Sequence, residues 1–146
     1  MNKQQRSFYD AMYGDEAPEH GQRSLIKRLI QHISTDRIEA ASALVPKGDS
    51  LLDVGCGDGS LLWSLTGKFE QGVGVDITMR PPVWNRDDTR KNGDMPLHTV
   101  VANIDEGLPF KASSYQVVIC IATLQHVFDP KHCLKEISHV MQPGGY

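Results

Sequence analysis

The chain has 146 residues, 40% of them hydrophobic and 23% charged, with a formal net charge of −3. This length predicts a single domain, 1–146, and the composition is that of an ordinary globular protein. The net negative charge gives no electrostatic reason to expect nucleic-acid binding. The sequence contains no apolar run of about 18 residues, so no membrane partner is predicted.

Residues 1–46 are predicted to form a helical segment that covers a sheet. Apolar residues recur at helical spacing between Leu25 and Ile33, opposite a charged face. A second helix is expected to begin near Asp36 and to end at Pro46, which cannot continue a helix. Its apolar face would comprise Ile38, Ala41, Leu44 and Val45.

The stretch from Ser50 to Leu65 organises the rest of the chain. The apolar run Leu51 to Val54 predicts a buried strand, and glycines follow at positions 55, 57 and 59. A helix is expected from Ser60, with Gly67 beyond its end. Strand, glycine turn and helix together predict a nucleotide-type pocket, because glycine lets a ligand lie against bare backbone.

The carboxylates around the turn decide which ligand is expected. A dinucleotide site needs the pattern G-x-G-x-x-G, but the third position here is Ser60, so a nicotinamide-dependent oxidoreductase is disfavoured. Asp53 and Asp58 would repel a pyrophosphate. A ligand with an ammonium group and no phosphate suits them, and S-adenosylmethionine is such a ligand.

The motif D-V-G-C-G-D-G at residues 53–59 resembles the first motif of the class I S-adenosylmethionine-dependent methyltransferases. The resemblance implies a Rossmann-like α/β fold, with a parallel sheet flanked by helices. It also implies that the cofactor S-adenosylmethionine is bound by Asp53, Gly55, Cys56, Gly57 and Gly59. A glycine turn without a ligand is the alternative.

A second short strand, Gly72 to Asp76, ends in an acid 17 residues beyond Gly59. This is close to the spacing at which a carboxylate accepts hydrogen bonds from a ribose diol. The family resemblance implies the same role for Asp76 and a cofactor contact at Ile77. The alternative is an aspartate that only shapes a turn at the strand end.

An irregular connection, 77–97, precedes a third strand at His98 to Ala102. The following segment, Asn103 to Phe110, is similar to the family segment that holds the adenine. In this register Asn103 replaces the usual acid and Ile104 packs on the ring. A shifted register would give the polar role to Asp105.

The fourth strand is expected at Tyr115 to Ile121, a nearly continuous apolar run. The loop after it resembles a family loop at the methyl-acceptor side, which implies a cofactor contact at Ile121. His126 is the candidate general base, because its unperturbed pKa lies near neutrality. A structural role beside Asp129 is the alternative for His126.

Asp129 and Pro130 predict the start of the last helix, as N-cap and first helical residue. Its buried face would comprise Leu134, Ile137, Val140 and Met141. The turn Pro143-Gly144-Gly145 leads in the family to a fifth strand, so an incomplete seven-stranded fold is expected, with a cofactor-binding core at 47–146. The outer edge of the fourth strand would be covered by the N-terminal helices or by a second copy in a homodimer.

The predicted function is therefore S-adenosylmethionine-dependent methyl transfer to a small-molecule acceptor. The alternative is a non-catalytic module that binds S-adenosylmethionine or another protein. The three cysteines lack the spacing of a metal site, no signal peptide precedes the fold, and a cytoplasmic location with reduced thiols is expected.

Overall fold

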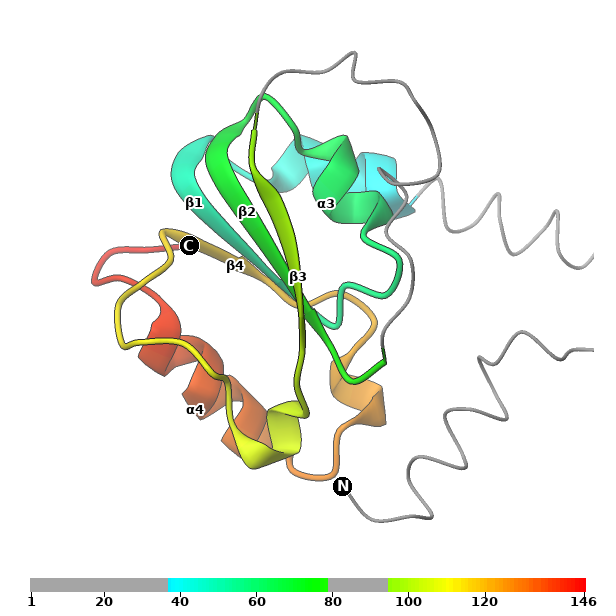
Figure 1. Ribbon diagram of the computed structural model, residues 1–146, viewed down its shortest axis with the longest axis vertical. Coiled ribbons are helices and arrows are strands. Elements are labelled where there is room, and N and C mark those ends of the chain that lie inside the picture. The colour runs from blue at the N-terminus through cyan, green and yellow to red at the C-terminus, as the bar shows by residue number, and fades with distance from the viewer. Residues whose placement is uncertain (1–36, 79–94) are drawn as a thin grey trace, which may run out of the picture. The chain divides into compact units, whose positions relative to one another are not determined.

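A computed structural model describes residues 37–78 and 95–146, and all of these except Arg37 belong to one compact unit that begins at Ile38. Four parallel strands form a sheet in the order β3-β2-β1-β4 (Figure 1). The strands are β1 Gly48–Val54, β2 Phe69–Asp76, β3 Leu97–Val101 and β4 Val117–Ile119. The helical elements are residues 37–44, α3 Ser60–Ser64, α4 Pro130–Val140 and the 3-10 turns η2 Ile104–Glu106 and η3 Leu124–His126. The predicted parallel α/β fold is confirmed.

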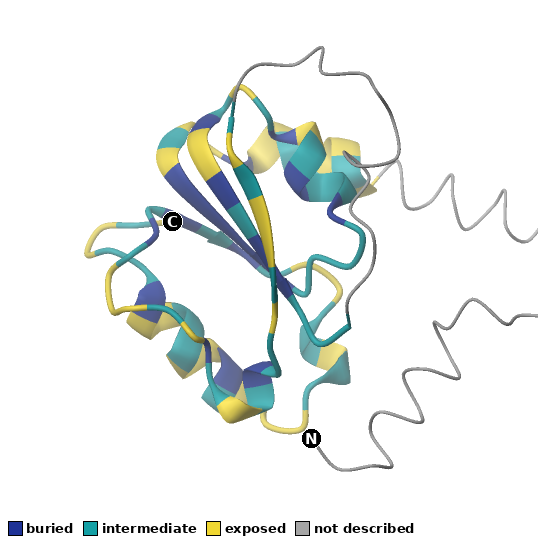
Figure 2. Ribbon diagram, viewed as in Figure 1, coloured by how far each residue is buried: buried dark blue, intermediate teal, exposed yellow. Residues whose placement is uncertain are grey.

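Helices cover both faces of the sheet, as a parallel sheet requires (Figure 1). Leu52 packs with Cys133 of α4 in one buried cluster, whereas its neighbour Leu51 packs with Leu62 of α3 in the other. The central strands are mostly buried toward their carboxyl ends, whereas exposed residues lie near their starts (Figure 2). Successive side chains of β1 therefore face opposite helical layers.

The register brings the carboxyl ends of the strands to one edge. Val54 of β1 pairs with Val75 of β2, and Asp76 pairs with Val101 of β3. On the other side of β1, Asp53 pairs with Ile119 at the end of β4. The turns that follow the strands consequently meet at this edge, where parallel α/β folds bind ligands.

The helix of residues 37–44 ends before Pro46, as predicted, but its apolar face differs. Val45 is buried, whereas Leu44 is 75% exposed. The Lys68 ammonium group donates hydrogen bonds to the carbonyl oxygens of Ser42 and Val45. A cation thus satisfies carbonyl groups at the end of this helix, where the helix dipole favours positive charge. The predicted capping residue Asp36 lies outside the described residues.

Helix α4 begins as predicted, because Asp129 Oδ1 accepts hydrogen bonds from the backbone N–H groups of Lys131 and His132. One residue of its predicted buried face, Leu134, is wrong. Cys133 is fully buried and Leu134 is 52% exposed. The face against the sheet is Cys133, Ile137 and Val140, at helical spacings of four and three.

Strand β4 is shorter than predicted, because its pairing with β1 covers residues 117–119 and Tyr115 makes an isolated bridge with Met141. Its outer edge pairs with Tyr146, whose N–H donates to Gln116 O at 2.9 Å and whose carbonyl accepts from Val118 N at 2.9 Å. These two bonds are those of a parallel strand pair. Tyr146 of the same chain thus takes this part of the edge, a partner that was not predicted.

Candidate cofactor site

The backbone of the glycine turn after β1 has a conformation that would be strained for any residue other than glycine. Gly55, Gly57 and Gly59 have φ values of 81°, 57° and 75°, in the left-handed region. The N–H groups of Gly55 and Cys56 both donate to Val75 O, at 2.7 and 3.1 Å. The turn is thus fastened to β2, and an added Cβ at Gly57 would face open space. A ligand can approach the backbone there.

Asp76, at the end of β2, joins this turn through its carboxylate. Its Oδ2 accepts a hydrogen bond from Gly57 N at 2.9 Å. Its Oδ1 accepts from both the N–H and the hydroxyl of Thr78, each at 2.9 Å. The half-buried carboxylate is therefore oriented from both sides, and Ile77 lies half-buried next to it.

Asp53 lies beneath the turn and is 3% exposed. Burial, and then the neighbouring charge of Asp76, raises the pKa of Asp53 to about 7. Without a cation nearby, Asp53 therefore carries only part of a negative charge at neutral pH. A bound cation would favour its ionised form.

The thiols near this edge are protonated at neutral pH. Burial raises the pKa of Cys120 to about 12, and burial together with the charge of Asp53 also raises the pKa of Cys56. Cys133 is fully buried, and burial likewise raises the pKa of its thiol. These cysteines act as small apolar residues rather than thiolate nucleophiles.

The end of β3 lies beside Asp76, because Ala102 N donates to Asp76 O at 2.9 Å. Asn103 follows, half-buried, and its Oδ1 accepts from Asp105 N at 3.1 Å as the cap of η2. Asp105 Oδ1 instead accepts from the N–H groups of Phe128 and Asp129. Asp105 thus holds the start of α4, which favours Asn103 as the polar residue of the site.

Ile104 is 9% exposed and belongs to the hydrophobic cluster between the sheet and α4. Its side chain therefore offers little surface to a ligand. The predicted stacking of Ile104 on an adenine ring has little support in this arrangement.

The loop after β4 closes the other side of the edge. Ile121 is 38% exposed, and Ala122 has a positive φ of 57°, which is strained for a residue with a side chain. The Thr123 hydroxyl contacts Val54 O at 3.0 Å and Ile121 O at 3.2 Å. His126 is half-buried in η3, and its backbone N–H donates to Thr123 O at 2.8 Å.

Two threonines in these contacts were not predicted from the sequence. Asp76 and Thr78 have the Asp-x-Thr spacing of a local side-chain turn, which is a usable signal. Thr123 gave no such signal, because its partner Val54 lies 69 residues away.

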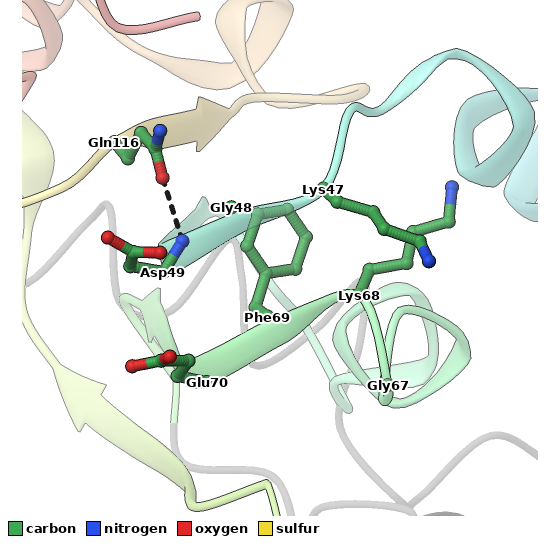
Figure 3. A pocket seen from close by; sticks show the side chains of 8 residues that line it. All are labelled: Lys47, Gly48, Asp49, Gly67, Lys68, Phe69, Glu70 and Gln116. Carbon is green, nitrogen blue, oxygen red and sulfur yellow. Dashed lines mark hydrogen bonds between the residues drawn. The ribbon is translucent and has the colours of Figure 1, made fainter.

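A hollow of about 480 Å³ lies at the opposite, amino-terminal edge of the sheet (Figure 3). Charged residues of β1 and β2 and the segments before them line it, with Phe69 and Gln116 between them. Gln116 Oε1 accepts a hydrogen bond from Asp49 N at 2.7 Å. The hollow is separate from the glycine turn.

The family profile described as "Methyltransferase domain" matches residues 52–146. The chain belongs to this family. Within it, the chain is 31% identical over 99 residues to the "Ubiquinone biosynthesis O-methyltransferase" of Cronobacter sakazakii, covering 68% of this chain and 40% of that protein. The methyltransferase-domain chain thus spans about two fifths of the length of the curated relatives it matches.

Solved structures agree with the family fold. A chain from the complex of the Haloferax volcanii Trm112 methyltransferase activator with a methyltransferase has a TM-score of 0.58 and 31% identity, covering 73% of this chain and 47% of that one. An S-adenosylmethionine-dependent methyltransferase from Aquifex aeolicus has a TM-score of 0.57 and 20% identity, and the match covers 74% of this chain and 58% of that one. These findings confirm the predicted methyltransferase family and its parallel α/β fold.

The structure brings most of the predicted cofactor residues together. One turn and its immediate neighbours hold Asp53, Gly55, Cys56, Gly57, Gly59 and Asp76. Ile77 and Asn103 lie beside it, and Ile121 lies in the loop after β4. No helix in the described residues is long and apolar enough to cross a membrane.

Proposed function

We propose that this chain binds S-adenosylmethionine at the carboxyl edge of its sheet and supports methyl transfer to a small-molecule acceptor. The observation that carries the proposal is the hydrogen bond from Gly57 N to Asp76 Oδ2. It fastens a bare-backbone turn to an oriented carboxylate. The bond thus places a surface on which an adenosyl ligand can lie next to a hydrogen-bond acceptor for the ribose hydroxyls of that ligand.

The residues present fit such a ligand. A carboxylate has about four acceptor positions, and the described contacts of Asp76 use three, two of them from Thr78. A ribose hydroxyl can bond to the remaining position on Oδ2. A second hydroxyl would replace the hydroxyl of Thr78, an exchange of like for like. Asp53 beneath the turn favours a positively charged ligand.

When bound, S-adenosylmethionine supplies a methyl group already activated by its sulfonium charge. The contribution of the chain is to orient this ligand and the acceptor and to exclude water between them. Relatives named for O-methylation in ubiquinone biosynthesis support an acceptor oxygen on a small molecule. We therefore propose a hydroxyl-bearing small molecule as the acceptor.

We propose His126 as the base that takes the proton from the acceptor hydroxyl. It is half-buried on the loop that closes the site, and Thr123 O fixes its backbone. Replacing His126 with alanine should lower kcat by roughly 100-fold or more, with the affinity for S-adenosylmethionine unchanged. His139→Ala, on the exposed surface of α4, is the control. An unchanged kcat in His126→Ala would contradict the role of His126 as the base. It would favour the alternative, a structural role beside Asp129.

The test of the function is a labelled-methyl assay with a panel of phenols and other small hydroxyl compounds. Formation of S-adenosylhomocysteine together with a methylated product, lost in Asp76→Ala, would support the proposal. Binding of S-adenosylmethionine without turnover on any acceptor would favour the alternative, a non-catalytic binding module.

We propose further that two copies of the chain pair through the outer edge of β4. Beyond the bonds to Tyr146, the same outward-facing side of the strand continues with Val118 O and Cys120 N. Gel filtration with light scattering should then give a dimer, and exchange of the Cys120 amide should slow with increasing protein concentration. A monomer with concentration-independent exchange would contradict self-pairing.

A further inference from the structure

Thr123 connects the loop after β4 to the start of the glycine turn. Its hydroxyl lies 3.0 Å from Val54 O, the last carbonyl group of β1, and 3.2 Å from Ile121 O. A hydroxyl has one proton, so these two carbonyl groups share it. The peptide group that leads into Gly55 is thereby held by a side chain from the loop after β4.

The contact leaves no space for a side chain at Gly55. A Cβ added at Gly55 would lie 2.1 Å from Thr123 Oγ1 and 2.6 Å from its methyl group, far inside normal contact. Gly55 also has a φ of 81°. Thr123 therefore fits against the backbone of Gly55 as one half of a close pair.

The same residue fixes the acceptor side of the site. Thr123 O accepts from His126 N at 2.8 Å, which sets the turn that carries His126. The preceding residue, Ala122, is held at a φ of 57°, a conformation that persists only where surrounding contacts impose it. Thr123 supplies two such contacts. Its hydroxyl contacts Ile121 O, before Ala122, and its carbonyl group accepts from His126 N, after Ala122.

We propose that Thr123 is a positioning residue, which sets the glycine turn for cofactor binding and aligns it with the loop of His126. This inference rests on the proposed function. Without the hydroxyl, Val54 O loses its side-chain donor and the turn is free to shift relative to β4. Cofactor affinity falls because part of the binding free energy must then reorder the turn.

The test compares isosteric variants. Thr123→Val keeps the shape and removes the hydroxyl, and should weaken S-adenosylmethionine binding in calorimetry by about 3- to 10-fold, the usual effect of one hydrogen bond. Thr123→Ser keeps the hydroxyl and should bind within about twofold of the wild type. Thr66→Val is the matched control, because Thr66 is also half-buried and its hydroxyl donates to Trp63 O at 2.8 Å, outside the site.

Amide hydrogen exchange of the unliganded protein gives a second readout. In Thr123→Val the amides of Gly55 and Cys56 should exchange faster than in the wild type, whereas Thr66→Val should leave them unchanged. Wild-type affinity and wild-type exchange in Thr123→Val would overturn the inference. Equal losses of affinity in Thr123→Val and Thr66→Val would also overturn it, since they would reflect general destabilisation.

Failure of the proposed function is distinguishable from failure of the inference. If the wild-type protein binds no S-adenosylmethionine, the proposed function fails. The exchange rates of Gly55 and Cys56 then still decide whether Thr123 positions the turn.

Discussion

The two ends of the sheet use polar residues in opposite ways. At the carboxyl edge, the side chains of Asp76 and Thr123 bind backbone groups of the glycine turn and the residue before it. At the amino edge, the pairing of Gly48 with Phe69 places Lys47 beside Lys68 and Asp49 beside Glu70 (Figure 3). Like charges on neighbouring strands repel one another.

The amino edge also makes contacts that serve stability. Lys68 binds the carbonyl groups of Ser42 and Val45, and Gln116 accepts the N–H of Asp49. The carboxyl edge instead leaves an open glycine backbone next to an oriented carboxylate. Substitutions at the carboxyl edge should therefore affect binding most, and those at the amino edge should affect folding.

The largest effect on binding is expected for Asp76→Ala. It removes the acceptor proposed for the ribose and frees Gly57 N, so the affinity for S-adenosylmethionine should fall by roughly 100-fold in calorimetry. Asp49→Ala, an aspartate at the amino edge, is the matched control and should keep wild-type affinity. Similar losses in both variants would remove the distinction between the edges.

Lys68→Met should show the reverse pattern. It leaves the carbonyl groups of Ser42 and Val45 without their cation, and the free energy of unfolding should fall by about 1–2 kcal/mol in urea titrations. Affinity for S-adenosylmethionine should not change. Lys47→Met, the exposed neighbour, should lower neither quantity, because it removes only a like charge beside Lys68. A weaker ligand affinity in Lys68→Met would contradict the separation.

The pH dependence of stability should depend on Asp53. Because its folded pKa is raised to about 7, the folded protein keeps a proton that the unfolded chain releases near pH 4. The contribution of Asp53 to the free energy of unfolding must then fall as pH rises from about 4 to 7, and the loss is complete above pH 7. Urea titrations of unliganded wild type and Asp53→Asn at pH 5 and pH 8 measure this. Parallel pH profiles would show that Asp53 does not titrate in this range.

The smallest effect is expected for Thr78→Val. The valine removes the hydroxyl that bonds to Asp76 Oδ1 and leaves that acceptor open to a ribose hydroxyl. Affinity for S-adenosylmethionine should rise by about twofold to threefold, since a competing hydrogen bond is lost. Weaker binding in calorimetry would instead mean that Thr78 orients Asp76 rather than competing for it.

The sequence predicted the carboxyl edge well because its signals are local. The glycine turn, Asp76 and Asn103 each follow a short apolar run, and parallel strands bring such positions together without further information. The start of α4 at Asp129 was readable for the same reason. Each of these predictions depends on neighbours within a few residues.

Contacts between distant segments were not readable. The pairings of Thr123 with Val54 and of Tyr146 with Gln116 join residues far apart in the chain. One residue on the buried face of α4 was misassigned, because Leu134 is more apolar in character than Cys133, yet Cys133 is the buried residue. The bond from Asp49 N to Gln116 Oε1 likewise joins residues 67 positions apart.

Calorimetric titration of the purified chain with S-adenosylmethionine, and with NAD as the phosphate-bearing competitor, tests the central claim most directly. Saturable one-to-one binding of S-adenosylmethionine, abolished or greatly weakened in Asp76→Ala, and no binding of NAD are predicted. A folded wild-type chain that binds NAD, or that binds S-adenosylmethionine equally well without Asp76, would contradict the account.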